Sequence, residues 1–328
     1  MTGGTVRHPE LTILVPVFNE EDSIAPFVAA IRPVLDALTA DWEILFVNDG
    51  SGDATLSAIR AAHAADARIT GIDFSRNFGK EIALSAGLDH AHGRAVVPID
   101  VDLQDPPEVI AEMVALWRGG AEVVLAKRRN RDSDSWLKRV SALGFYSVIA
   151  RLSSTRIPRN VGDFRLLDAR VVAALRGYPE RERFMKGIFA HVGFRTAVVH
   201  YVRAPRRHGD SKFRPVQLYN LALDGIVSFS TLPLKIWTWF GFAFALLAIV
   251  YTSVIVVRTM MTGIDVPGYA SLMSVMLVFA SVVLVGLGVQ GEYIARIYAE
   301  VKQRPLYLVR ERIGGVVADA HPKADDLP

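Results

Sequence analysis

Three aspartates and a glutamine follow an apolar run in the segment AVVPIDVDLQDPPE, residues 95–108. Side chains alternate between two faces in an extended chain, so Asp100, Asp102 and Gln104 are expected to point the same way. Two carboxylates and an amide oxygen suit a hard divalent cation such as Mg²⁺ or Mn²⁺, which proteins often hold together with substrate phosphates. The segment contains no His or Cys that would favour zinc, and it therefore predicts a magnesium or manganese site.

The rest of the same segment is typical of a helix start. Asp105 is out of phase with the two earlier aspartates, and two prolines and Glu108 follow it. We expect Asp105 to be the N-cap, Pro106 to take the first helical position and Glu108 to close a capping box. This assignment explains Asp105, but it does not explain Asp100 and Asp102, which remain candidates for the metal site.

Two other polar loops have the composition of a ligand site, VPVFNEE at residues 15–21 and NDGSGD at 48–53. Asp49 has the chemistry to accept hydrogen bonds from a nucleobase or a ribose, although Asp-Gly-Ser is equally typical of a simple turn. Glu20 and Glu21 fit either a ligand site or the acidic first turn of a helix, which the helix dipole favours. The residues alone leave both alternatives open.

A basic segment, RRHGDSKF at residues 206–213, has the composition of a phosphate-binding loop. Arginine and lysine offset the charge of phosphate groups, and arginine can bind them through two parallel hydrogen bonds. The alternative is a cationic patch attracted to anionic lipid headgroups. We favour phosphate binding by Arg206 and Lys212.

Alternating strand and helix patterns over residues 11–128 must position these loops. Short runs rich in Val and Ile predict buried strands at 11–18, 43–48, 69–73, 95–100 and 122–128. Amphipathic stretches between them predict helices at 23–38, 53–65, 80–91 and 106–118. This alternation is typical of an α/β fold with a mainly parallel sheet, which binds its ligand at the carboxyl ends of the strands. Residues 129–200 are mixed in character, and a final strand is expected near 195–203.

Two long uncharged segments, 236–257 and 271–291, predict transmembrane helices. Each is long enough as a helix to cross the roughly 30 Å hydrocarbon core of a bilayer. Lys and Arg flank the pair on its outer sides, whereas the connector carries only Arg258, so both ends are expected in the cytoplasm. The preceding stretch, 215–235, is amphipathic and fits either a juxtamembrane helix lying on the bilayer or an ordinary packed helix.

These segments predict a cytoplasmic catalytic domain over residues 1–214 and a cytoplasmic tail over 292–328. The first residues do not resemble a signal peptide, since their apolar core is short and ends in Asn and Glu. The sequence GLGVQG at 286–291 matches the dinucleotide-binding pattern. It lies within a predicted membrane span, however, where small residues favour helix packing instead.

The overall composition excludes several classes of site. The 328 residues include no cysteine, which excludes disulfides and any zinc or iron–sulfur centre ligated by Cys. The formal net charge of +3 is too small by itself to suggest nucleic-acid binding. Hydrophobic residues make up 51% of the chain, and their excess is local to the two predicted spans.

A resemblance extends over nearly the whole chain, through ordered blocks that include VPVFNEE, NDGSGDAT, SRNFGKE, DVDLQDPPE, NVGDFRLLD, GDSKF and GEYIARIYAEVKQRPLY. These blocks resemble the polyprenyl-phosphate glycosyltransferases of the inverting family-two group, which have the GT-A fold and two C-terminal membrane helices. Within that family the chain is most similar to members that glucosylate bactoprenol. The family usually has two aspartates before Gly-Ser in the second loop, and this chain has Asn48 in place of the first.

The resemblance implies roles for the residues at matching positions. The nucleotide-sugar pocket would be lined by Pro16, Asn19, Glu20, Asp49, Asp100 and Ser211. Residues acting in catalysis would be Asp102, Asp163, Arg165, Arg206 and Lys212. Arg206, Ser211 and Lys212 would also form a mobile loop that grips phosphate. Mg²⁺ or Mn²⁺ would be held on the diphosphate by Asp102, with Asp100 and Gln104 nearby. Whether Asp100 touches the metal or only the nucleoside is left open.

The resemblance also implies a substrate pair and a location. The donor would be a nucleotide sugar, with UDP-glucose favoured over UDP-galactose, GDP-mannose or an aminoarabinose nucleotide, and the acceptor would be undecaprenyl phosphate. The protein would be a homotetramer in the bacterial cytoplasmic membrane, supplying a flippase and a downstream glycosyltransferase that modifies O-antigen. The acceptor is a phosphate monoester with a second pKa of about 6, so it is largely a dianion at neutral pH and needs no general base. Its direct attack on the anomeric carbon would invert the configuration.

Two other classes of function are weaker interpretations of the same residues. A processive polysaccharide synthase would share the donor-binding domain, but it would need more membrane helices and a QxxRW motif, which this chain lacks. A membrane-tethered scaffold or nucleotide-sugar sensor would not need both an acidic metal face and a basic phosphate-binding loop.

Overall fold

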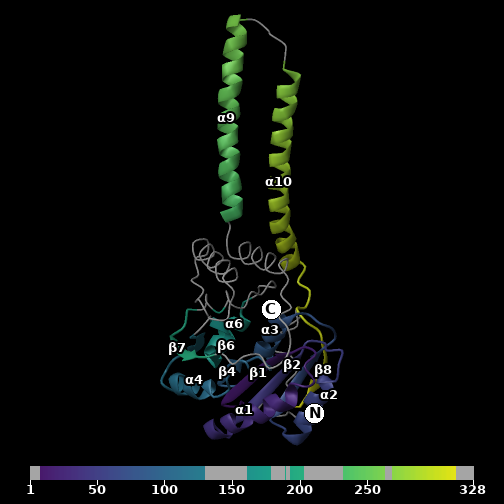
Figure 1. Ribbon diagram of the computed structural model, residues 1–328, viewed down its shortest axis with the longest axis vertical. Coiled ribbons are helices and arrows are strands. Elements are labelled where there is room, and N and C mark those ends of the chain that lie inside the picture. The colour runs from purple at the N-terminus through teal and green to yellow at the C-terminus, as the bar shows by residue number, and fades with distance from the viewer. Residues whose placement is uncertain are drawn as a thin grey trace, which may run out of the picture. The chain divides into compact units, whose positions relative to one another are not determined.

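The computed structural model describes residues 8–129, 161–178, 189, 193–202, 232–262 and 268–314. The chain divides into two compact units (Figure 1). The first contains the mixed β-sheet and comprises residues 1–150, 155–214 and 304–328. The second contains two long helices and comprises 151–154 and 215–303. The predicted phosphate-binding residues Arg206, Ser211 and Lys212 lie outside the described residues, as does most of the predicted helix at 215–235.

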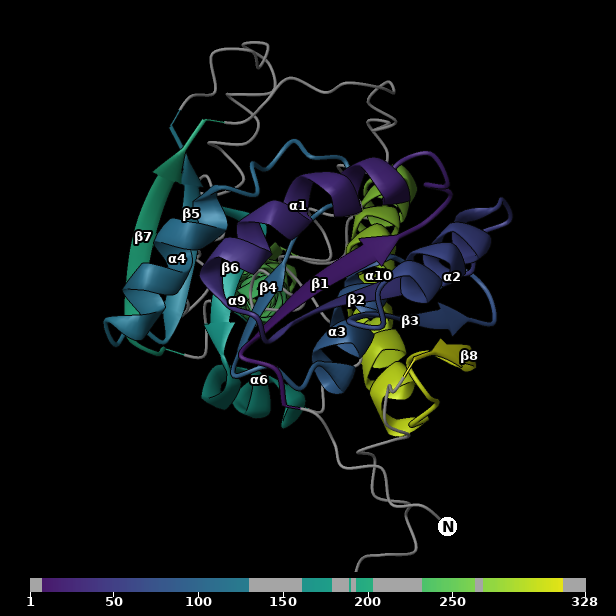
Figure 2. The same ribbon diagram turned by 90° about the horizontal axis from the view of Figure 1, so that it is seen from below.

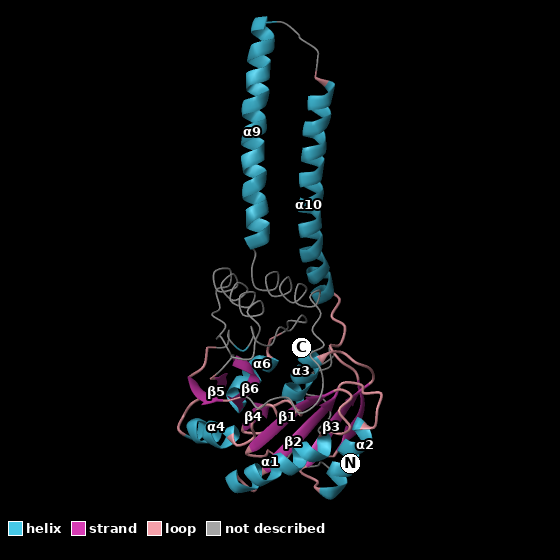
Figure 3. Cartoon of the chain, viewed as in Figure 1, coloured by secondary structure: helices cyan, strands magenta, loops and turns pink. Residues whose placement is uncertain are grey.

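The first unit is built on one sheet, whose strands are drawn in magenta in Figure 3. The described strands are β1 (Leu11–Val17), β2 (Trp42–Asn48), β3 (Ile69–Phe74), β4 (Ala95–Pro98), β5 (Val123–Arg128), β6 (Val161–Asp168), β7 (Thr196–Tyr201) and β8 (Val309–Ile313). Their order across the sheet is β7-β5-β6-β4-β1-β2-β3-β8. The five strands predicted over residues 11–128 and the strand predicted near 195–203 are confirmed, whereas β6 and β8 were not expected.

The centre of the sheet is parallel and its additions are antiparallel. Strand β1 pairs in parallel with β2 and β4, and β2 pairs in parallel with β3, as β5 does with β7. Strand β6 runs antiparallel between β4 and β5, and β8 runs antiparallel to β3 at the sheet edge. The result is a GT-A-like α/β fold with a mostly parallel sheet, as predicted.

Helices cover both faces of this sheet (Figure 2). One face packs against α1 (Ile24–Leu38), α2 (Thr55–Ala65) and α4 (Val109–Arg118), and the other against α3 (Lys80–His90) and α6 (Ala169–Arg176). Strand alternation sets this division, because Ile13 and Val15 join the first core cluster while Leu14 joins the second. All three side chains are fully buried, which is why the strands are apolar on both faces.

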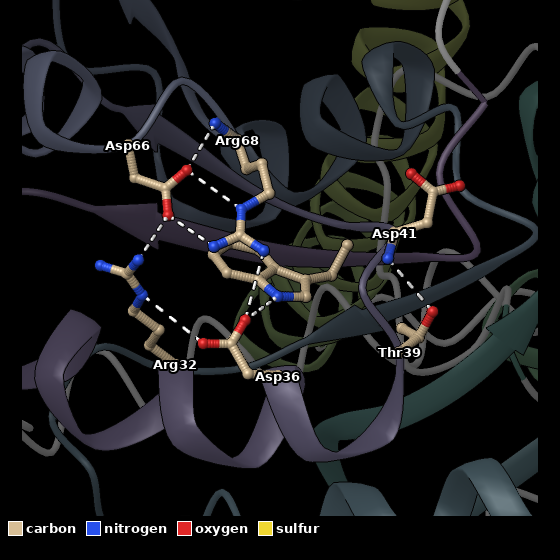
Figure 4. Close-up of polar contacts among 7 residues, drawn as sticks. Arg32, Asp36, Thr39, Asp41, Asp66 and Arg68 are labelled. Carbon is tan, nitrogen blue, oxygen red and sulfur yellow. Dashed lines mark hydrogen bonds and ion pairs between the residues drawn. The ribbon is translucent and has the colours of Figure 1, made fainter.

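A polar cluster fastens helix α1 to the amino ends of β2 and β3 (Figure 4). The indole of Trp42 donates a 2.8 Å hydrogen bond to Asp36, and the guanidinium of Arg68 lies 3.7 Å from the Trp42 ring centroid. Arg68 also pairs with Asp66 at 2.8 Å, and Arg32 bridges the two aspartates. These contacts lie at the edge of the sheet opposite the carboxyl ends of the strands, so they serve stability.

The second unit contains the helices α9 (Leu232–Thr262) and α10 (Tyr269–Val301). Both extend beyond the predicted spans at 236–257 and 271–291. Among the described residues, Val278–Val301 is long and apolar enough to cross a membrane, and Ile236–Tyr251 is a shorter apolar stretch. A Cβ atom at Gly286 would collide with the indole of Trp237, so this glycine permits close packing of the two helices.

Candidate active site

A cavity of about 460 Å³ opens at the carboxyl ends of the central strands. Its walls come from the ends of β1, β2 and β4, from the loop after β3 and from the start of α3. The lining residues are Pro16, Val17, Phe18, Glu20, Asp49, Asn77, Gly79, Lys80, Ala83, Asp100, Val101 and Asp102. The structure thus gathers five of the predicted site residues in one cavity, namely Pro16, Glu20, Asp49, Asp100 and Asp102, at the edge where a parallel α/β sheet binds ligands.

Asp49 fastens the loop that follows β3. Its Oδ1 accepts from the backbone N–H of Phe78 at 2.7 Å, and its Oδ2 accepts from that of Gly79 at 2.9 Å. The residue is only 3% exposed. Burial raises the pKa of the Asp49 carboxyl, although the two backbone donors favour its charged form. A carboxylate has further lone pairs, so Asp49 can fix this loop and still accept from a ligand.

The first two strand-end loops are joined by reciprocal hydrogen bonds. The backbone N–H of Asn19 donates to Oγ of Ser51 at 2.9 Å, and the backbone N–H of Gly52 donates to Oδ1 of Asn19 at the same distance. Asn19 has a left-handed φ of 53°, which asparagine tolerates better than most residues. Asn19 itself is not among the cavity-lining residues, but both of its chain neighbours are. Its described contacts therefore hold the wall in place.

Lys80, which the sequence analysis did not single out, lies at the centre of the cavity's charges. Its ammonium is 2.5 Å from Oδ1 of Asp100 and 3.3 Å from Oδ2 of Asp163. Asp163 arrives there because β6 runs antiparallel to β4, so β6 begins where β4 ends. Desolvation lowers the Lys80 pKa, but the two carboxylates outweigh it and hold the pKa above its usual value. Lys80 could have been suggested as a site residue from the sequence, because it follows Gly79 at the start of a predicted helix.

The expected extended backbone through residues 100–104 is wrong. Strand β4 ends at Pro98, and Leu103 has a left-handed φ of 54°, so side chains do not alternate here. Asp100 and Asp102 both line the cavity, but Gln104 is 6% exposed and does not. Instead the backbone N–H of Gln104 donates to Oδ1 of Asp102 at 3.1 Å. The structure therefore brings the two carboxylates together without the amide.

The predicted capping role of Asp105 is also wrong. Helix α4 begins at Val109 with Glu108 at the N-cap, and no side chain caps it. Asp105 is buried and accepts a 2.5 Å hydrogen bond from the hydroxyl of Tyr201, with Arg128 at 4.0 Å. Burial and the hydrogen bond to Asp105 raise the pKa of Tyr201 to about 12. Asp105 thus ties the loop after β4 to strand β7.

Arg165 lies in the protein interior. It is 4% exposed, its Nη2 donates to the carbonyl of Gly162 at 2.6 Å, and its guanidinium lies 4.0 Å from the ring centroid of Phe189. Burial lowers the pKa of Arg165 to about 10. It is not among the cavity-lining residues. Among the predicted pair, Asp163 therefore lies near the cavity charges, while Arg165 supports the strand that carries it.

The acidic residues of the cavity suit a divalent cation that shares its coordination with a ligand. No group of three or more His, Asp or Glu side chains close enough to hold a metal occurs within the described residues. Asp100 and Asp102 supply two carboxylates, which matches the way Mg²⁺ is bound together with substrate phosphates. Lys80 pairs with Asp100 at 2.5 Å, so a cation bound by Asp100 would lie beside a lysine.

The chain is similar to known glycosyltransferases along most of its length. Residues 12–176 match the family described as glycosyl transferase family 2, and residues 232–297 match the GtrB C-terminal hairpin. The chain is 50% identical over 305 residues to the uncharacterized glycosyltransferase sll0501 of Synechocystis sp., covering 93% of this chain and 96% of the relative. It is 49% identical over 302 residues to the SfII prophage-derived bactoprenol glucosyl transferase of Shigella flexneri, covering 92% of this chain and 98% of the relative.

Among solved structures, the chain is similar to the mannosyltransferase PcManGT from Pyrobaculum calidifontis, in complex with GDP-Man and Mn²⁺. The two share 19% identity and a TM-score of 0.45, covering 92% of this chain and 89% of the other. The sequence matches are far stronger, since about half of the residues are identical over more than nine-tenths of both chains. The chain belongs to glycosyl transferase family 2, and it continues into the GtrB C-terminal hairpin.

Proposed function

We propose that this glycosyltransferase moves a sugar from a nucleotide sugar onto the phosphate of a membrane polyprenyl phosphate, with inversion at the anomeric carbon. UDP-glucose is the proposed donor and undecaprenyl phosphate the proposed acceptor. The main support for this proposal is the cavity lined by Asp49, Asp100 and Asp102. The chain that forms it is 49% identical to a bactoprenol glucosyl transferase over 92% of its length. A cavity of this volume is within the roughly 300–1,000 Å³ of small-molecule sites.

The nucleoside is proposed to lie against the ends of β1 and β2. Pro16 and Glu20 form one wall there, and Asp49 offers acceptor oxygens for the base or the ribose. The fixed loop partners of Asp49 keep its carboxylate in one orientation before the ligand arrives. Such preorganisation lowers the entropic cost of binding.

The diphosphate is proposed to lie at the end of β4, where Asp102 and Asp100 would hold Mg²⁺ or Mn²⁺ together with it. A bound cation would offset the negative charge of the leaving nucleoside diphosphate. Lys80 lies in the same cavity and adds a fixed positive charge beside the anion. Asp163 also contacts the ammonium of Lys80, at 3.3 Å.

The acceptor phosphate is proposed to attack the anomeric carbon directly. Its oxygen forms the new bond as the bond to the nucleoside diphosphate breaks, and no proton needs removal because the phosphate is mainly a dianion at neutral pH. Arg206, Ser211 and Lys212, outside the described residues, are proposed to hold this phosphate. The catalytic role of the chain is then to offset charge and align the reacting groups.

A lipid acceptor requires the site to work at a membrane surface. We propose that α9 and α10 both cross the bilayer, with the catalytic domain and both termini on the cytoplasmic side of a bacterial inner membrane. The apolar stretch Val278–Val301 supports this for α10. The match of residues 232–297 to a hairpin family supports the paired arrangement. A homotetramer, a flippase and a downstream glycosyltransferase are proposed partners.

The test is a donor screen with membranes that contain the full chain. Undecaprenyl phosphate is incubated with radiolabelled UDP-glucose, UDP-galactose or GDP-mannose, and lipid-linked sugar is separated by thin-layer chromatography. We expect glucose transfer and its loss by at least about 100-fold in Asp102→Ala, since a metal contributes several kcal/mol. Glu108→Ala is the matched control, because that exposed acid on the same segment lies outside the cavity.

Two outcomes would contradict the proposal. A polymeric product would favour a polysaccharide synthase, and the absence of lipid-linked sugar with every donor would remove the proposed acceptor. Near-normal transfer by Asp102→Ala would remove the metal assignment while leaving the reaction in place.

A further inference from the structure

We propose that Arg310, on the C-terminal strand β8, is a positioning residue for the donor cavity and acts through Asp73 and Asn48. The proposal rests on the proposed function only in taking a nucleotide sugar as the ligand. Arg310 does not line the cavity. It is connected to the cavity wall by a chain of short hydrogen bonds through the interior of the sheet.

The first connection joins β8 to β3. Asp73 pairs with Glu311 and Phe74 pairs with Val309, which leaves Arg310 as an extra residue in the ladder. Such irregularities re-aim side chains. Both Nε and Nη2 of Arg310 lie 2.6 Å from Oδ2 of Asp73. The Arg310 side chain is half exposed, whereas that of Asp73 has no exposed surface, so Arg310 brings positive charge from the protein edge to a buried carboxylate.

The second connection joins β3 to β2. Asn48 and Asp73 are register partners in adjacent parallel strands, and Nδ2 of Asn48 donates to Oδ1 of Asp73 at 2.7 Å. Both residues are fully buried. An amide is needed at position 48, because a second carboxylate would place two negative charges side by side without water.

The third connection reaches the cavity wall. Oδ1 of Asn48 accepts from the hydroxyl of Ser51 at 2.5 Å and from its backbone N–H at 3.3 Å. The same hydroxyl accepts from the backbone N–H of Asn19, between the cavity-lining residues Phe18 and Glu20. Asn48 also immediately precedes Asp49 in the chain. The position of both donor-binding loops therefore depends on the orientation of one buried amide.

The orientation of that amide is fixed only if Asp73 presents an acceptor to it and Arg310 neutralises Asp73. In this series of hydrogen bonds each donor side chain has one acceptor side chain. Arg310 and Asn48 both donate to Asp73, and Ser51 donates to Asn48. Reversing the bond between these two strands preserves the pattern, because an amide at position 73 would donate to a carboxylate at position 48 and still accept from Arg310 through its carbonyl oxygen. The double change Asn48→Asp with Asp73→Asn is thus expected to keep what each single change breaks.

The experiment measures donor affinity in four variants of the full chain: Asn48→Asp, Asp73→Asn, their double variant and Arg310→Met. KM and kcat for UDP-glucose, the melting temperature, and UDP binding by calorimetry are recorded for each. Glu311→Gln is the matched control, because it breaks the neighbouring exposed pair between Glu311 and Arg60 and leaves the hydrogen bond from Arg310 to Asp73 in place.

We expect KM and the Kd for UDP to rise by about tenfold in Asn48→Asp and in Arg310→Met, with kcat changed less than about threefold. The double variant should return to within about threefold of wild type, and the control should match wild type. A merely structural role would lower the melting temperature without moving Kd. Arg310→Lys, which keeps the charge, is tested in case Arg310→Met fails to fold, and it should give an intermediate Kd.

Two results would overturn the inference. One is wild-type affinity for UDP in folded Arg310→Met or Arg310→Lys, and the other is a double variant as weak as the poorer single variant. Failure of the proposed function is distinguishable, since wild-type protein would then bind UDP but transfer no glucose to the lipid.

Discussion

The ammonium of Lys80 lies 2.5 Å from Oδ1 of Asp100, a carboxylate that the sequence predicted to lie at a divalent-cation site. A cation at Asp100 must therefore compete with a lysine that is already charged and already in place. Under the proposed function, this competition would leave Asp102 as the main carboxylate for a metal, while Asp100 pairs with Lys80 in the cavity.

Replacing Lys80 by methionine should therefore tighten metal binding in the absence of donor. The change removes the ammonium that contacts Asp100 and Asp163, so the Mn²⁺ concentration for half-saturation should fall by about three- to tenfold. Glucose transfer should fall at the same time, because the diphosphate loses a fixed positive charge. Electron paramagnetic resonance of free Mn²⁺ measures the first effect. Lys80→Arg is the control, and unchanged Mn²⁺ binding in Lys80→Met would contradict the competition.

Replacing Asp49 by alanine should weaken donor binding. The backbone N–H groups of Phe78 and Gly79, which are partly buried, would lose their acceptors, at up to about 1–3 kcal/mol for each donor. We expect KM for the nucleotide sugar to rise at least about tenfold, with a smaller rise in Asp49→Asn, which keeps one acceptor oxygen. The exposed Asp22→Ala, on the neighbouring loop, should change neither KM nor stability.

Replacing Tyr201 by phenylalanine should destabilise the first unit without changing donor affinity. The lost hydrogen bond to the buried Asp105 carboxylate should cost about 2 kcal/mol, and the melting temperature should fall by roughly 4–8 °C. The pKa of Tyr201 is raised from 10 to about 12, so the bond contributes fully below pH 10 and is lost as the pH rises through 12. The difference in stability between wild type and Tyr201→Phe should shrink over that range. A changed KM would point to a direct role in binding.

Replacing Arg68 by methionine should lower stability through the cluster in Figure 4. We expect a loss of about 1 kcal/mol, or roughly 2–4 °C in melting temperature, from its ion pairs and its contact with the Trp42 ring. The hydrogen bond from Trp42 is the main cause that lowers the pKa of Asp36, and Arg68 adds to it. Arg68 also lowers the pKa of Asp66. Their contribution is therefore present above pH 3.8 and lost as the pH falls toward the lower folded values. The variant and wild type should differ less at about pH 3 than at about pH 7, and an equal difference would contradict this account.

The sequence predicted the parallel centre of the sheet because each strand there is a short apolar run between amphipathic helices. It did not predict β8, whose residues VRERI are mostly charged and suit a sheet edge as well as a solvated tail. It did not predict β6 either, since the strand follows a stretch of mixed character and pairs only with distant segments.

The candidate site was predictable where function depends on strand ends and unpredictable where it depends on distant partners. Asp49, Asp100 and Asp102 follow predicted strands and do line the cavity. Asp105 resembled a helix cap because its true partner, Tyr201, lies 96 residues away. Gln104 was misplaced because one left-handed residue, Leu103, ends the alternation.

The pairing of β8 with β3 also sets the order in which the first unit can be completed. A ribosome makes the two long helices before it makes Arg310, so the β3 edge of the sheet stays open until β8 has emerged. Until then β3 exposes unpaired backbone groups, and the carboxylate of Asp73 has no arginine beside it. A fragment that ends before residue 304 would lack β8 and would keep this edge of the sheet unpaired.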